Sequence, residues 1–242
     1  MELTDANFLV LVSGSFLAAL FSAAFSAGGA MIILAITTVV LPVSAVVPIH
    51  STLLIGSTAT RSVLFREYID WTLAGPFLVG SAVGALIGAR IYVELPETVI
   101  ATAISIVMIV SIWLPGISWR PKIRHPWAIV GFVHSLLSTL FAYGAALQAV
   151  ILHTKLERKQ IVGTMAGSLF GMSVFKITGY IVVGFDYRPY LWVIVAGLAV
   201  SLVGTWLGRM VVDRISETLF RNAYRILVTV TAIRLLYVNL MA

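Results

Sequence analysis

The chain contains no cysteine, and few of its residues are charged. The missing cysteines exclude disulfide bonds and thiolate metal sites. Charged residues make up only 11% of the 242 residues, whereas hydrophobic residues make up 60% and the mean hydropathy is +1.03. Soluble domains carry about 25% charged residues, so this balance indicates a membrane protein. The net charge of +6 lies mostly in loops between apolar segments, which predicts a lipid bilayer as partner and no nucleic acid.

The chain also lacks acidic residues inside its apolar segments. All ten lie at the termini or near loop boundaries. An intramembrane aspartyl protease, or a buried carboxylate that binds sodium or relays protons, would need an acid at that depth. Neither a Gly-x-Ser-x-Gly nucleophile motif nor a His-Glu-x-x-His metal motif is present. We therefore expect no enzyme activity, no catalytic residues, no metal and no cofactor.

The first long apolar segment contains a break. From Phe8 to Leu41 there is no charged side chain, and Ala27-Gly28-Gly29-Ala30 lies in the middle. One helix of this length would measure roughly 51 Å, against a hydrocarbon core of about 30 Å. A break at the paired glycines would give two shorter helices that meet inside the membrane. In transporters such broken helices often form the substrate site.

The features of this segment recur later in the chain. Further apolar stretches cover residues 45–66, 71–94, 97–114, 127–154, 160–184, 189–211 and 218–240. Phe141-Ala-Tyr-Gly144 aligns with Phe25-Ser-Ala-Gly28 at an offset of 116. Gly204-x-x-x-Gly208 aligns with Gly84-x-x-x-Gly88 at an offset of 120. These offsets predict two related halves.

The halves cover residues 1–115 and 126–242, and residues 116–125 form a basic loop between them. We expect an all-α polytopic membrane protein in which each half is one broken or re-entrant segment followed by three transmembrane helices. If the broken segments were ordinary crossings, the halves would be parallel, and Lys and Arg would fall on both sides. If they enter and leave on one side, the second half is inverted.

The positive-inside rule favours the inverted repeats, because they place most basic residues on one side. This cytoplasmic set is Arg66, Arg120, Lys122, Arg124, Lys155, Arg158, Lys159, Arg209, Arg214, Arg221 and Arg225. Only Arg90, Arg188 and Arg234 lie near the other side. Both termini are then predicted to be periplasmic. Full hairpins made of two short crossings would give the same sidedness, so both forms stay open.

Two embedded cations, Arg61 and Lys176, are the main candidates for binding an anion. A charge inside an apolar segment usually faces a cavity, a partner or the membrane surface. At 3.6 residues per turn, His50 and Ser57 share the helix face of Arg61, and Ser173 and Tyr180 share that of Lys176. Such donors beside a positive charge suit an oxyanion. The alternative is that both cations extend to the interface.

The two breaks supply the other candidates. Half-helices that begin near Ala30 and Ala145 would direct backbone N–H groups at an anion, and Gln148 lies one turn beyond the second break. The predicted substrate-binding residues are Gly28, Gly29, Ala30, His50, Ser57, Arg61, Gly144, Ala145, Gln148, Ser173, Lys176 and Tyr180. Glycines in membrane helices can instead serve close packing, as we expect for Gly80, Gly84 and Gly88. His134 and His153 are candidates for relaying a coupling proton, because histidine titrates near neutral pH. The alternative for His134 is a structural hydrogen bond. The alternative for His153 is that it is a simple loop residue.

Short motifs are spread over nearly the whole chain. They are Ser26-Ala-Gly-Gly-Ala30, Ala142-Tyr-Gly-Ala145, Ile49-His-Ser-Thr52, Ile161-Val-Gly-Thr164, Tyr68-Ile-Asp-Trp71, the glycine-rich run from Gly80 to Arg90, and Leu95-Pro-Glu97. In this pattern the chain resembles the TauE/SafE family of sulfite and organosulfonate exporters. Two departures are the single glycine of the second break and His50-Ser-Thr52 in place of the family's Gly-Thr-Ser.

The resemblance implies a multi-pass transporter of the bacterial inner membrane. Its expected substrate is a small anion, sulfite or an organosulfonate, carried outward, and a homo-oligomer is compatible with this expectation. The alternatives are a transporter of another small anion such as a carboxylate, a membrane-embedded enzyme, or a non-transporting scaffold. The missing intramembrane acids disfavour the enzyme.

Overall fold

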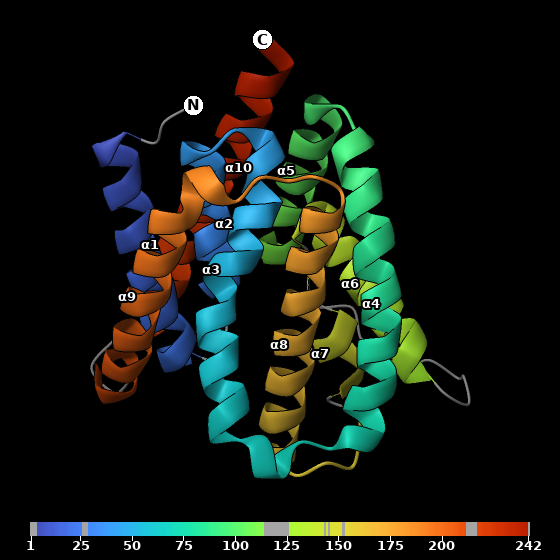
Figure 1. Cartoon of the computed structure of the whole chain (residues 1–242). Helices are drawn as coiled ribbons and strands as arrows, with labels where there is room; N and C mark the ends of the chain where they lie inside the picture. Colours follow the sequence, from blue (N-terminus) through green and yellow to red (C-terminus); the bar gives the residue numbers. More distant parts are fainter. Residues whose placement is uncertain are drawn as a thin grey trace. The chain divides into compact units, whose positions relative to one another are not determined.

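The computed structural model describes residues 4–25, 29–113, 126–142, 144, 146–151, 153–211 and 217–241, and the regular elements in these ranges are all helices (Figure 1). The α-helices are α1 (Asp5–Phe25), α2 (Gly29–Val40), α3 (Val43–Leu64), α4 (Trp71–Glu94), α5 (Glu97–Trp113), α6 (Pro126–Phe141), α7 (Ala146–Ile151), α8 (Arg158–Val182), α9 (Leu191–Val211) and α10 (Glu217–Met241). Short 3₁₀ turns η1 (Arg66–Tyr68) and η2 (Arg188–Tyr190) precede α4 and α9.

The described helices include five that are long and apolar enough to cross a membrane. They are the segments 5–23, 43–64, 71–94, 158–182 and 188–208. The polytopic all-α prediction is therefore confirmed at this level. Of the predicted features, Gly28, Ala145 and the basic loop of residues 116–125 lie outside the described residues.

The helices group into two compact units that do not follow the order of the sequence. Unit 1 contains residues 1–57, 96–114 and 186–242, and unit 2 contains residues 58–95 and 115–185. Helix α3 passes from unit 1 into unit 2 between Ser57 and Thr58.

In unit 1, α1 and α2 form an antiparallel hairpin. A Cβ on Gly29 would lie 2.6 Å from the Ala18 carbonyl oxygen and 2.7 Å from Ser22 Cβ, and Gly14 faces Ile36 in the same way. The contacts pair the start of α2 with the end of α1, so α2 runs back along α1. The predicted reversal after residue 25 is therefore present. At about 1.5 Å per residue, α2 measures roughly 18 Å and is shorter than a full crossing.

Helix α9 closes the other side of α1. Glycines allow their backbones to approach closely, since a Cβ on Gly204 or Gly208 would collide with the carbonyl oxygens of Phe16 and Leu20. Helix α10 packs on α5, where the Trp113 indole N–H donates to Thr229 Oγ1 at 3.1 Å. Helix α1 begins and α10 ends at the same end of unit 1 (Figure 1).

In unit 2, α4 and α6 also pack closely through glycines. A Cβ on Gly80 or Gly84 would collide with the carbonyl oxygens of Ala128 and Phe132, and one on Gly131 would collide with that of Phe77. A Cβ on Gly88 would lie 2.9 Å from Thr139 Cβ. These contacts agree with the packing role expected for the glycines of α4.

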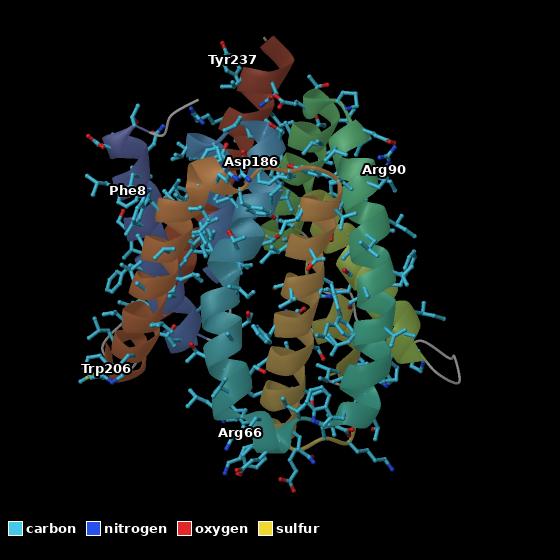
Figure 2. All side chains as sticks on the ribbon, in the orientation of Figure 1. Phe8, Arg66, Arg90, Asp186, Trp206 and Tyr237 are labelled. Atoms are coloured by element: carbon cyan, nitrogen blue, oxygen red, sulfur yellow. The ribbon has the colours of Figure 1, made fainter. Side chains whose placement is uncertain are left out.

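The remaining elements of unit 2 position its second break. Helix α8 packs against α4, and a cluster of Phe77, Val130, Leu147, Val150 and Met172 fills the space between α4, α6, α7 and α8. Arg66 and Arg90 lie at opposite ends of this unit (Figure 2). Their positions are those expected of a helix α4 that crosses the bilayer between them.

Candidate functional site

The predicted site residues are divided between the two units. Unit 1 holds Gly29, Ala30, His50 and Ser57, and unit 2 holds Arg61, Gly144, Gln148, Ser173, Lys176 and Tyr180. The unit 2 set includes the most deeply buried cation that the sequence predicted. Lys176 is only 2% exposed, although it lies well inside α8.

Ser138 of α6 holds the Lys176 ammonium. The Nζ atom donates to the Ser138 carbonyl oxygen at 2.9 Å and to the Ser138 hydroxyl at 3.0 Å. One turn further along α8, the Tyr180 hydroxyl donates to the Thr139 carbonyl oxygen. The α8 side chains therefore bind the backbone of the last turn of α6, immediately before the second break. Lys176 is therefore bound inside unit 2 and is not exposed at its surface.

No acidic side chain pairs with Lys176 among the described residues. The ion pair found there joins Arg90 and Glu94 at 2.9 Å on the exposed end of α4. Lys176 instead has a serine hydroxyl and a backbone carbonyl as partners, which are neutral. An ammonium has three N–H groups, and two are directed at Ser138. The positive charge is therefore solvated by dipoles and is not cancelled by a carboxylate.

His134 is the second buried polar group of this region, one helical turn before Ser138. Its Nδ1 accepts a hydrogen bond from the Leu147 backbone N–H at 2.9 Å. A nitrogen that accepts carries no proton, so the neutral ring has its proton on Nε2. Nε2 has no hydrogen-bond partner among the described residues. It faces Gly144, where an added Cβ would lie 3.6 Å away.

The break beside His134 has an unusual backbone. Ala142 has a φ angle of 56°, the only positive value found for a described non-glycine residue. Its N–H donates to the Ser138 carbonyl oxygen at 3.1 Å, which is the same oxygen that Lys176 binds. An alanine in the left-handed region costs about 1–2 kcal/mol. The end of α6 is therefore strained at the point where the cation contacts it.

Unit 1 has its own contact between a histidine and a half-helix. His50 of α3 is buried, and its Nε2 donates to the Ala30 carbonyl oxygen at 2.9 Å. Ser57 bonds the Leu54 carbonyl oxygen of its own helix at 3.1 Å. Gly29 faces Ala18 and Ser22 of α1, so close packing accounts for a glycine at this position.

The other predicted residues of unit 2 take less central positions. Arg61 is half-buried near the end of α3, and Gln148 is exposed. Ser173 is buried, and its hydroxyl bonds the Leu169 carbonyl oxygen at 2.8 Å, within α8. The structure therefore brings Lys176, Tyr180 and Gly144 to the second break. Each of the three contacts a residue of α6: Lys176 contacts Ser138, Tyr180 contacts Thr139, and Gly144 faces His134.

The sequence matches a family model described as Sulfite exporter TauE/SafE over residues 11–235. The chain belongs to this family. Members of the TauE/SafE family are transporters, so this chain is a membrane transporter of the class that carries sulfite or related anions, and it is not an enzyme. No curated protein and no solved structure matches the chain.

Two TauE/SafE motifs from distant parts of the sequence contact each other in unit 2. The Asp70 backbone N–H donates to Thr164 Oγ1 at 2.9 Å, and a Cβ on Gly163 would lie 2.7 Å from the Phe65 carbonyl oxygen. The Asp70 side chain also accepts from the Thr72 N–H at 2.9 Å and so caps α4. These motif residues join the start of α8 to the turn before α4.

Sequence reasoning missed the partners on α6. Ser138 and Thr139 were not predicted, although they bind Lys176 and Tyr180 through their oxygens. Ser135 and Ser168 were also missed, and their buried hydroxyls have no partner among the described residues. The Ser-Thr pair just before the break was the available signal. Serine and threonine in membrane helices usually bond their own backbone, which gives them little weight in a sequence.

Proposed function

We propose that this TauE/SafE protein transports a small anion, sulfite or an organosulfonate, outward across the bacterial inner membrane, and that Lys176 binds the anion. The observation that carries the proposal is a buried lysine without an acidic partner among the described residues. A charge in a medium of low dielectric is costly unless an opposite charge or strong hydrogen bonds compensate for it. An anion beside Nζ would supply that opposite charge.

The geometry also supports an oxyanion as the ligand. Lys176 offers its remaining N–H, and the neutral His134 ring offers Nε2–H beside Gly144. Two donors of this kind, from α8 and α6, match the several acceptor oxygens of a sulfite or sulfonate group. His134 Nε2 is buried, and a Cβ added at residue 144 would lie 3.6 Å from it, so a side chain there would occupy space beside this donor.

We further propose that the two sequence halves are inverted repeats, with both termini in the periplasm. Equivalent contacts in the two units support this. Helix α9 packs on α1 through Gly204 and Gly208, and α4 packs on α6 through Gly84 and Gly88. In the alignment of the halves, α9 corresponds to α4 and α1 corresponds to α6. The common end at which α1 begins and α10 ends also agrees with termini on one side (Figure 1).

Thermal unfolding of the purified protein against a panel of anions tests the substrate. The panel contains sulfite, methanesulfonate, acetate and chloride at equal ionic strength. We expect sulfite or methanesulfonate to raise the unfolding midpoint in a saturable manner, because a ligand at 100 times its dissociation constant stabilises the folded state by about 2.7 kcal/mol. A shift with acetate alone would identify a carboxylate carrier. Equal shifts with all four salts, or none, would contradict anion binding.

A further inference from the structure

Two histidines bind the backbone of half-helices, but they do so with opposite hydrogen-bond roles. His50 donates from Nε2 to the Ala30 carbonyl oxygen near the start of α2. His134 accepts at Nδ1 from the Leu147 N–H near the start of α7. The first four N–H groups of a helix have no partner within it, so His134 provides the acceptor for one of them. A proton on the ring therefore has different consequences at the two sites.

Protonation would reverse the role of His134. A charged imidazole carries protons on both ring nitrogens and donates from both. Nδ1–H would then face the Leu147 N–H, and two donors at 2.9 Å repel each other. The ring or the start of α7 has to move. His50 would keep its hydrogen bond when protonated, because its Nε2 already donates.

We infer that His134 is the binding site of a coupling proton, and that proton binding at Nδ1 releases the start of α7 from α6. This inference rests in part on the proposed function, because the anion at Lys176 is what couples the proton to transport. The displaced element is short. Helix α7 contains six residues and contacts α6 through the Leu147 hydrogen bond and the apolar cluster around Phe77.

Among the described residues, Lys176 is the one charged group that faces His134. From α8, Lys176 binds Ser138, one turn along α6. From α4, the Phe77 ring lies edge-on, with ring centroids 5.8 Å apart. Helix α7 has no titratable side chain, and α6 has none besides His134. Tyr180 is bound to Thr139, and Tyr143 lies outside the described residues.

This charge arrangement links the proton to the anion. With the site empty, the Lys176 ammonium disfavours a second positive charge one turn away. An anion beside Lys176 would offset that repulsion and raise the proton affinity of His134. Linkage requires the reverse as well, so the protonated ring would bind the anion more tightly. Proton and anion are therefore expected to bind together.

The first test follows the start of α7 by hydrogen exchange in the full-length protein. Exchange is measured between about pH 4 and pH 8, both without anion and with saturating methanesulfonate, because the empty site disfavours the ring proton, and is corrected for the intrinsic rate. We expect the protection factor of the peptide covering Ala146–Ile151 to fall by about fivefold or more at the acidic end of the range. This is the change in the opening equilibrium that the loss of one hydrogen bond would cause. The peptide covering Gly29–Val40 serves as the internal reference and should not change. Constant protection of the α7 peptide in the wild type would overturn the inference.

A matched pair of variants assigns the effect to one ring. In His134→Asn the amide oxygen replaces Nδ1 as acceptor and does not titrate, so the α7 peptide should stay protected at both ends of the range. In His50→Gln the side chain keeps a donor at the position of Nε2, and the response of α7 should match the wild type. An acid-dependent loss of protection that persists in His134→Asn would assign the proton to another group.

The second test measures proton uptake with a pH dye in weakly buffered solution. Methanesulfonate is the probe, because its sulfonate does not titrate near neutral pH. We expect the wild type to take up about one proton per bound anion at pH values where the empty site is unprotonated and the anion-bound site is protonated. His134→Asn also loses the Nε2 donor, so it should bind methanesulfonate more weakly, and at saturating methanesulfonate it should do so without proton uptake. Equal uptake by both proteins would contradict the inference, whereas a wild type that binds neither methanesulfonate nor sulfite would contradict the proposed function and leave the exchange test to decide on His134.

Discussion

Lys176 donates to both oxygens of Ser138, the carbonyl at 2.9 Å and the hydroxyl at 3.0 Å. The same carbonyl oxygen accepts the Ala142 N–H that ends α6. The buried cation and the turn of the second break therefore share one acceptor. An anion bound as proposed would draw the ammonium away from this oxygen and would thereby change the hydrogen bonding of the turn.

Removing the Lys176 charge should weaken anion binding much more than folding. Lys176→Met keeps the apolar bulk and removes one charge-assisted hydrogen bond to the ligand, so we expect about a 10- to 100-fold loss of affinity. Titration of monodisperse protein by thermal shift checks this. Lys155→Met, an exposed loop position, is the control and should bind normally. Arg61→Met should show a smaller effect, since Arg61 is only half-buried. Unchanged affinity in Lys176→Met would remove this lysine from the site.

Relieving the strained turn should stabilise the protein. Ala142 has φ 56°, a conformation that glycine adopts without the clash of a Cβ. We expect Ala142→Gly to raise the free energy of unfolding by about 0.5–1 kcal/mol. Ala103→Gly, inside α5, is the comparison and should lower it by about the same amount. Chemical unfolding in detergent measures both. A destabilised Ala142→Gly would mean that the left-handed turn is not strained.

The close contact of α4 with α6 should tolerate no side chain at Gly80. An added Cβ would overlap the backbone of Ala128, so Gly80→Ala is expected to destabilise the protein by about 1–3 kcal/mol or more. Gly75 of the same helix has no atom within 4 Å of such a Cβ. Because Pro76 offsets the gain in helix propensity, Gly75→Ala should change stability by less than about 0.5 kcal/mol. Similar midpoints for the two variants would be inconsistent with this packing.

A substitution at Gly29 tests whether this glycine serves helix packing or anion binding. Its Cβ would lie 2.6 Å from the Ala18 carbonyl oxygen, so Gly29→Val should lower the yield and thermal stability of the folded protein. If the residue serves packing, the monodisperse fraction should retain native anion affinity, measured by the same titration. A normal yield with lost affinity would instead place the first break in the binding site, as the sequence predicts.

Single-cysteine labelling tests the predicted sidedness, since the native chain has no cysteine. An impermeant thiol reagent added to intact cells should label Glu2→Cys and should label neither Lys122→Cys nor Lys155→Cys. All three should react after the membrane is permeabilised, which controls for accessibility. Labelling at position 122 but not at position 2 in intact cells would contradict the inverted repeats.

The sequence predicted the long helices well because their ends carry local signals. The apolar stretch 71–94 coincides with α4, which Asp70 caps and Pro96 follows. The start of α8 was predicted two residues late, because the capping box of Glu157 and Gln160 was not recognised. The breaks were also located correctly, since a charge-free run that is too long for one crossing has to reverse or bend.

The contacts at the site were only partly predictable. Lys176 and Tyr180 could be chosen because an embedded charge is costly and both lie on one helix face. Their acceptors on α6 depend on which helices become neighbours, and no local pattern specifies that. The hydrogen bond of His134 to Leu147 needs the reversal of α7 as well. A structural bond was an open alternative for this histidine, but its partner could not be named from the sequence.

The discontinuous make-up of the units constrains the order in which the chain can fold as it is synthesised. All segments of unit 2 precede residue 186, so its contacts can form before the last two helices emerge. Helix α1 is made first, yet its glycine-bearing neighbour α9 begins only at Leu191. Until then the face of α1 around Phe16 and Leu20 has to be covered by lipid or by a chaperone. A nascent chain arrested before residue 191 should therefore leave this face of α1 without its protein neighbour.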